Sequence, residues 1–177
     1  MSCSELQSSA RSRRARLAAL LTPLALSGCF QPLYGTLGPG VLESELQAIQ
    51  VEPIADRVGH YVENELVFGF NGSRAPVPPK YRLLVKINER VQTPVVDTVT
   101  FRTTSATVVT DAEFTLVPVG GGPPIYSSKA FAAASYDRFS ARASNVRAAR
   151  DAEQRDARVL ADNIRTQVSA FFARRGS

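Results

Sequence analysis

The sequence predicts an α+β fold, a two-layer sandwich in which two helices cover one face of a four-stranded, mostly antiparallel sheet. Three observations predict it: period-two apolar alternation over residues 80–91, a stretch rich in Val, Thr and Phe over residues 94–117, and a long amphipathic pattern from about Asn145. Alternation with a period of two indicates a strand covered on one face, whereas a 3.6-residue period indicates a helix. The expected element order is therefore β-α-β-β-β-α.

The first half of the expected domain supplies one strand and one helix. Residues 48–53 alternate weakly and indicate a first strand. Asp56 is a candidate N-cap for the helix that follows. The apolar positions of this helix fall at helical spacing: Val58, Tyr61, Val62, Leu66 and Phe70. We expect the helix to end before Asn71-Gly72-Ser73, ahead of the rigid segment 76–79.

Three further strands are expected in the middle of the chain. Over residues 80–91 alternate positions differ in polarity. One set of alternate positions holds the apolar residues Tyr81, Leu83, Val85, Ile87 and Val91. The other set holds the polar residues Lys80, Arg82, Lys86, Asn88 and Arg90. Val99 and Phe101 share one parity, but Val108, Phe114 and Leu116 share the other. A bulge or turn near Thr103 to Ser105 would explain this switch. Gly120 to Pro124 indicates a turn before a last strand over residues 125–136.

The C-terminal segment predicts one long helix that is firmest from Val159 onward. Its apolar face comprises Ala149, Ala152, Val159, Leu160, Ile164, Val168 and Phe171. Its polar face comprises Arg150, Glu153, Arg155, Arg158 and Asp162. Asp151 and Arg155 are spaced to form an ion pair along the helix.

The N-terminal segment has the layout of a bacterial lipoprotein signal. Four arginines between Arg11 and Arg16 form a positive region, and the apolar run Leu17 to Leu26 follows. This run is much shorter than the roughly 20 residues that a membrane-spanning helix needs. Leu26-Ser27-Gly28-Cys29 then has the pattern of a lipobox, in which the Cys29 thiol takes the lipid. We expect a signal peptide over residues 1–28, a lipidated tether over 29–46 and one folded domain over 47–177.

Composition excludes several classes of protein and of site. Removal of residues 1–28 takes away four arginines and one acid, leaving 17 basic and 15 acidic side chains, a net charge of +2. The mature chain therefore lacks the strong positive charge that would be the main argument for a nucleic-acid partner. Cys3 and Cys29 are the two cysteines of the sequence, so the mature chain can form no internal disulfide and no cysteine-based zinc site.

The candidate catalytic residues lack the partners that an active site needs, so we do not expect an enzyme. We also expect no cofactor and no metal. His60 is the single histidine, and the sequence has no GxSxG-type motif that would hold a nucleophilic serine for it. Gly120-Gly121-Gly122 precedes prolines rather than a helix, so it predicts a hairpin turn and not a phosphate loop. The glutamate pairs Glu43/Glu45 and Glu63/Glu65 are expected to point apart and to be solvated.

A binding surface is better supported than an active site. Lys86 and Arg90 lie on the outward parity of their strand, and Arg102 can join them across the sheet. A second group, Arg138, Arg142 and Arg147, precedes the long helix. Arginine and lysine at such positions can hold phosphates or acidic partner loops, although a normally solvated surface remains the alternative for each residue.

The expected mature start, Cys29-Phe30-Gln31-Pro32-Leu33-Tyr34-Gly35, resembles that of the alphaproteobacterial lipopolysaccharide-assembly lipoproteins, LptE. The resemblance extends through Tyr81-Arg82-Leu83, Ser128-Lys129-Ala130 and the alanine-rich, charged terminal helix. It implies a lipoprotein of the outer membrane that plugs and helps assemble the LptD β-barrel and binds lipopolysaccharide. The family's basic pair near the second-to-third strand turn has no clean match here, because residues 92–97 contain no basic side chain.

The flanking residues Lys86, Arg90 and Arg102 are therefore the candidate lipopolysaccharide ligands, and replacing Arg90 and Arg102 by glutamate should weaken binding. The alternative function is that of another envelope lipoprotein, a periplasmic binding or scaffolding module built on the same sandwich. A lipid-anchored hydrolase would require His60 to act without visible partners.

Replacing Cys29 by alanine tests the signal. We expect Cys29→Ala to abolish acylation and membrane retention, because the thiol is the attachment atom and acyl chains supply the anchoring free energy. Mass spectrometry of the mature N-terminus and membrane fractionation measure both effects. Unchanged acyl content and unchanged membrane retention in the variant would contradict the assignment.

Overall fold

The structure, a computed structural model, describes residues 41–72, 77–93 and 104–175 of the 177-residue chain. Its elements are α2 (Val41–Gln47), β1 (Ile49–Val51), α3 (Arg57–Asn71), β2 (Tyr81–Gln92), β3 (Ser105–Pro118), β4 (Tyr126–Asp137) and α4 (Arg142–Arg175). The sheet order is β1-β2-β3-β4, with β1 parallel to β2 and the other neighbours antiparallel. The predicted α+β class and strand-helix order are confirmed, with α2 as an additional element.

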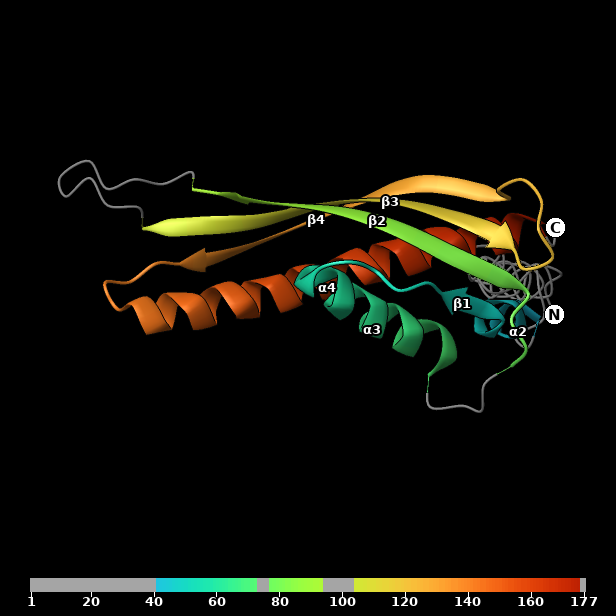
Figure 1. Ribbon diagram of the computed structural model, residues 1–177, viewed down its shortest axis with the longest axis horizontal. Helices are drawn as coiled ribbons and strands as arrows, with labels where there is room; N and C mark the ends of the chain where they lie inside the picture. The colour runs from blue at the N-terminus through green and yellow to red at the C-terminus, as the bar shows by residue number, and fades with distance from the viewer. Residues whose placement is uncertain (1–40, 73–76, 94–103, 176–177) are drawn as a thin grey trace, which may run out of the picture. The chain divides into compact units, whose positions relative to one another are not determined.

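The two helices α3 and α4 lie on the same side of the sheet (Figure 1). Strand alternation explains this arrangement, because successive side chains of a strand point to opposite faces. In β3 the inward parity is buried throughout, from Ala106 to Leu116, and in β4 it includes three buried alanines, Ala130, Ala132 and Ala134. The outward parity of all three long strands faces away from the helices.

The main apolar core lies between this inward face, α3 and the second half of α4. Val58, Val62, Leu66 and Phe70 of α3 are buried, as the helical spacing predicts. From α4 the core takes Ala157, Leu160, Ala161, Ile164, Val168 and Phe172. Alanines on both β4 and α4 leave room for the helix axis to lie close to the strand.

The outer edge of β4 is covered by polar side chains of α4. The guanidinium of Arg155 donates to the carbonyl oxygen of Ser135 at 3.0 Å. Asn163 and Gln167 donate to the carbonyl oxygens of Phe131 and Lys129, each at 3.0 Å. An exposed strand edge invites pairing with another chain, so these bonds protect β4 from aggregation.

Three details of the helices differ from the sequence prediction. Val159 is 49% exposed, whereas Glu153, assigned to the polar face, is only 5% exposed. Glu153 is buried because Arg57 of α3 pairs with it through two hydrogen bonds of 2.8 and 2.6 Å. Asp56 does occupy the N-cap position, but it has φ 70° and its side chain makes no capping hydrogen bond.

The strands and the N-terminal boundary also differ in part. Val91 keeps the predicted inward parity, opposite Val108, but it is exposed because β2 extends past the part of the sheet that the main core covers. The helix α2 (Val41–Gln47), with its buried Leu42, begins within residues 29–46, which the sequence assigned to the tether, and crosses the predicted boundary by one residue. The register of β2 and β3 is continuous over the described residues, and Val99 and Phe101 lie outside them.

A pair of glycine substitutions tests the packing of α3. An added Cβ at Gly59 would lie 2.8 Å from Cγ2 and 3.0 Å from the carbonyl oxygen of Ile54. We expect Gly59→Ala to lower the free energy of unfolding by about 1–3 kcal/mol, since the backbone would have to shift. Gly69 provides the control, because its Cβ would meet only the flexible Arg165 side chain at 3.1 Å.

For Gly69→Ala we expect no loss, or a gain of up to about 1 kcal/mol from helix propensity. Denaturant titration of both variants measures the difference. Equal effects at the two positions would contradict the close approach of Ile54 to α3.

Candidate functional site

The structure places Lys86 and Arg90 on the open face of the sheet, as predicted, while Cys29 and Arg102 lie outside the described residues. Across the strands Lys86 is in register with Glu113, and Glu113 with Lys129. Lys129 Nζ lies 2.6 Å from Glu113 Oε1, and Arg90 forms an ion pair with Asp111. The basic residues on this face are thus largely matched by neighbouring carboxylates.

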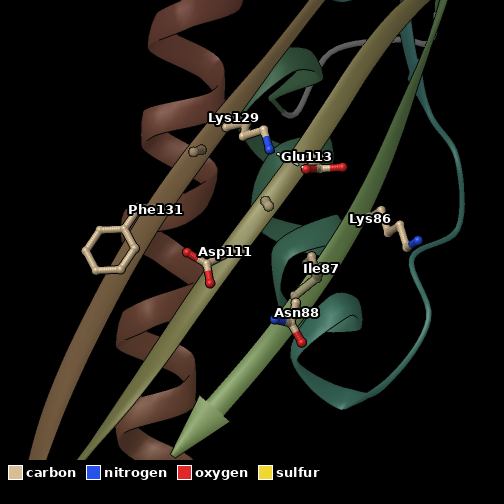
Figure 2. A pocket seen from close by; sticks show the side chains of 9 residues that line it. Lys86, Ile87, Asn88, Asp111, Glu113, Lys129 and Phe131 are labelled. Atoms are coloured by element: carbon tan, nitrogen blue, oxygen red, sulfur yellow. Dashed lines mark ion pairs between the residues drawn. The ribbon is translucent and has the colours of Figure 1, made fainter.

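The pairing also sets the ionisation of this face. The hydrogen bond from Lys129 lowers the pKa of Glu113, and the same contact raises the pKa of Lys129. A shallow depression of about 440 Å³ lies here, between Lys86 of β2, Glu113 of β3, and Lys129 and Phe131 of β4. Figure 2 shows Lys129 reaching to Glu113 beside this depression. An anionic ligand would have to compete with carboxylates that already hold these cations.

The second predicted basic group lies at the connection between β4 and α4, at the end of the sheet away from β1 and α2 (Figure 1). Arg138, Arg142 and Arg147 are all exposed. Phe139 and Val146 stand among them, 62% and 46% exposed. We call these five residues the arginine tip. Large apolar side chains exposed among unpaired cations indicate a surface for an amphiphilic anion.

The arginines of the tip differ from those of the sheet face in their pairing. Within the described part of the chain, no ion pair or side-chain hydrogen bond involves Arg138, Arg142 or Arg147. Arg150, which the sequence assigned only to the polar face of the helix, is exposed one turn beyond Val146 and is likewise unpaired among these residues. Their guanidinium groups are therefore available to an external anion.

The side chain of Asn145 holds the loop that carries Phe139. The Phe139 amide donates to Asn145 Oδ1 at 2.7 Å, and Asn145 Nδ2 donates back to the Phe139 carbonyl oxygen at 2.8 Å. The Arg138 amide also donates to the carbonyl oxygen of Thr104 at 2.9 Å. These bonds fix the backbone while the ring stays exposed, so the tip is pre-organised. The sequence marked Asn145 only as a helix start.

The remaining sequence candidates have ordinary structural surroundings. His60 is exposed on α3, with Nε2 lying 3.2 Å from Nδ2 of Asn64. Gly121 and Gly122 have φ of 82° and 127° in the turn between β3 and β4, as a glycine turn requires. The described residues contain no group of three acidic, histidine or cysteine side chains arranged to hold a metal ion. Among those residues no helix combines the length and apolarity needed to cross a bilayer.

The glutamates expected to be solvated are instead partnered. Glu45 accepts from Lys80 Nζ at 2.6 Å and from the Tyr81 hydroxyl at 2.9 Å, and the bond from Lys80 lowers its pKa. Glu63 accepts from the Ile54 amide, and Glu65 lies 3.5 Å from Arg158. The partners of Glu45 and Glu65 come from distant parts of the chain, and that of Glu63 is a backbone amide before the helix, so helical spacing alone did not reveal them.

Loss of the Asn145 side chain should loosen the arginine tip. We expect Asn145→Ala to lower stability by about 1 kcal/mol, the usual contribution of such bonds, and to speed hydrogen exchange at the Phe139 amide. Asn64→Ala is the matched control, because Asn64 is exposed and contacts only His60 among the bonds described. Unchanged exchange at Phe139 in Asn145→Ala would show that other contacts hold the loop.

No family model and no curated protein matches this sequence. Solved structures nevertheless share its fold. A Caulobacter crescentus protein, whose name assigns it to the lipoproteins, superposes with a TM-score of 0.66 at 19% identity, covering 77% of this chain and 98% of that one. Rare lipoprotein B from Shewanella oneidensis gives 0.51 at 12% identity, covering 73% of this chain and 98% of its own. At such identities the likeness establishes the fold alone: the chain has the sandwich fold seen in these two proteins.

Proposed function

We propose that the protein is a lipid-anchored envelope lipoprotein of the LptE type, which plugs and helps assemble the LptD β-barrel in the outer membrane and binds lipopolysaccharide. In this proposal the lipid is attached at Cys29, within the lipobox pattern. The protein acts without a catalytic group or cofactor. Its function is to bind its partners through its surface.

The observation that carries the proposal is the arginine tip. Arg138, Arg142 and Arg147 are exposed and unpaired among the described residues, and they surround the exposed Phe139 and Val146. Guanidinium groups match the geometry of phosphate oxygens and can bind them through two parallel hydrogen bonds. Lipopolysaccharide combines phosphates with acyl chains, so it suits a surface where arginines and apolar side chains alternate.

The tip supports lipopolysaccharide binding better than the predicted sheet-face residues do. Arg90 is occupied by Asp111, and Glu113 lies between Lys86 and Lys129. A ligand phosphate at this face would displace an existing ion pair, whereas a phosphate at the tip would not. That Lys86, Arg90 and Arg102 bind lipopolysaccharide stays a prediction, and it is the alternative that the experiment below compares with the tip.

The fold and the sequence pattern support the envelope assignment. Rare lipoprotein B and the Caulobacter lipoprotein share this sandwich over nearly their whole length. The open sheet face carries ion-paired and hydroxyl side chains, among them the Thr107–Ser135 and Thr115–Ser127 pairs at 2.8 and 3.1 Å. A polar, rigid face of this kind fits contact with the polar interior of a large barrel.

Charge reversal at the tip tests lipopolysaccharide binding. We expect Arg138→Glu with Arg142→Glu and Arg147→Glu to weaken binding by at least roughly tenfold, since each lost charge-assisted bond contributes on the order of 1.5 kcal/mol or more. The matched control is Lys86→Glu with Arg90→Glu, which should change affinity by less than about twofold. Binding of the lipidated, full-length protein to immobilised lipopolysaccharide in detergent measures both.

The two variants separate the alternatives. Weakened binding in the sheet-face variant alone would move the site to Lys86 and Arg90. Unchanged binding in both would refute a lipopolysaccharide site on the described surface. Co-purification of a large β-barrel with the tagged protein tests the LptD partnership separately, and normal barrel maturation after depletion of the protein would contradict it.

A further inference from the structure

The apolar interior is divided in two by a band of polar side chains. The main core ends on α4 at Ala157 and on β3 at Ala112. A smaller cluster, Val108, Ala134 and Ala152 with Tyr136 packed against it, lies nearer the arginine tip. Between the two clusters stand buried Thr110 on β3 and buried Glu153 and Asp156 on α4. With Arg57 of α3 and Glu89 of β2, these residues form what we call the polar layer.

Glu89 belongs to the layer by register and by charge. It lies opposite Thr110 in the β2–β3 pairing and shares the inward parity of Ile87, although its side chain is exposed at the rim of the sandwich. Partial desolvation raises the pKa of Glu89, and the nearby charges of Glu153 and Asp156 raise it further, while Arg57 lowers it. The layer therefore brings together three carboxyl groups and one guanidinium.

One oxygen of the layer, Asp156 Oδ1, has no hydrogen-bond partner in the described part of the chain. Asp156 is fully buried, and Thr110 donates its hydroxyl hydrogen to Asp156 Oδ2. Among the described residues nothing bonds to Asp156 Oδ1, which is also buried. Arg57 cannot neutralise this carboxylate fully, because both of its described hydrogen bonds go to Glu153 at 2.8 and 2.6 Å. An ionised carboxylate in such a position is costly, whereas a protonated one is neutral and much cheaper to bury.

We propose that the polar layer is a proton-operated latch, which keeps the first three turns of α4 packed on β3 and β4 when Asp156 is protonated and lets them open when it is ionised. The Arg57–Glu153 pair fixes the hinge, since it ties α4 to α3 at the boundary. Beyond the hinge, the apolar cluster that the described residues form between the helix and the sheet is small, consisting of Val108, Ala134, Ala152 and Tyr136. Alanines bury little apolar area, so water can enter there at small cost.

The sign of the pH dependence follows from the direction of the shift. Burial raises the pKa of Asp156 above its ordinary value of 3.8, and the hydrogen bond from Thr110 only opposes this. The closed state therefore binds a proton more tightly than the open state. Its extra stability is present at low pH and is lost as the pH rises from about the ordinary value through the pKa of the closed state. The charged or titratable groups around the layer are Asp56 at the N-cap of α3, Arg57 and Tyr61 of α3, Glu89 of β2 and Glu153 of α4. From β4 the residue opposite Thr110 is the apolar Ala132.

Hydrogen exchange of the full chain, corrected for intrinsic rates, tests the latch. As the pH rises from about 4 to 8 we expect protection of amides 146–152 to fall, because the extra stability of the closed state is lost when Asp156 ionises, while amides 160–172 change less than about twofold. Asp156→Asn mimics the neutral carboxyl and should hold protection of 146–152 near its low-pH level throughout. Asp162→Asn, an exposed change on the same helix, should behave as the unaltered protein does.

A second variant keeps the test decisive if Asp156→Asn fails to fold. Glu89→Gln changes only an exposed rim residue and should reduce the loss of protection at pH 8 several-fold, because it removes one facing negative charge. Protection of 146–152 that does not vary with pH in the unaltered protein would overturn the proposal. So would a pH dependence that survives unchanged in Asp156→Asn, or in Glu89→Gln. The readout is independent of what the protein binds.

Discussion

The contact between α4 and the inward face of the sheet is the interaction on which the rest of the fold depends. Neither layer can bury its apolar stripe alone, and α4, with 34 residues, is long enough to run along most of the sheet. Because α3 packs on both α4 and β1, its position follows from that of α4. The edge of β4 is closed by the same helix, through Arg155, Asn163 and Gln167.

This contact is not uniform along the helix. Toward the C-terminus it is apolar and includes the ring stack of Tyr126 on Phe171, with centroids 4.8 Å apart. Toward the N-terminus the buried side chains are alanines, and the polar layer separates the two parts. Stability should therefore decrease toward the arginine tip. Local opening of the first turns of α4 would therefore leave the remainder of the sandwich packed.

Charge is distributed with a similar division. On the open sheet face, cations sit beside carboxylates on neighbouring strands, so the face is nearly neutral despite its many charged groups. At and next to the tip, four arginines lie within residues 138–150, and the acids that flank this segment in sequence are Asp137 and Asp151, of which Asp151 pairs with Arg155. Paired charges give a surface that is polar and solvated, whereas unpaired ones leave binding capacity unused. The sheet face is thus nearly balanced in charge, whereas the tip carries unpaired cations among the described residues, which is the basis of the anion-binding proposal.

The sequence alone determined the elements that bury one face against a single neighbouring layer, because their apolar residues then recur with the period of a strand or a helix. These elements are the strand from Tyr81 to Ile87, the buried face of α3 and the second half of α4, and together they determine the α+β class. It also supplied the lipobox pattern and the basic group before α4. Tertiary structure decided which cations are free, because Asp111 and Glu113 come from another strand than Lys86 and Arg90. It also decided that Glu153 is buried and Val159 exposed, since Arg57, almost a hundred residues away, provides the compensating charge. Periodicity reports which face a residue occupies, but a partner from a distant segment determines whether a charge can be buried there.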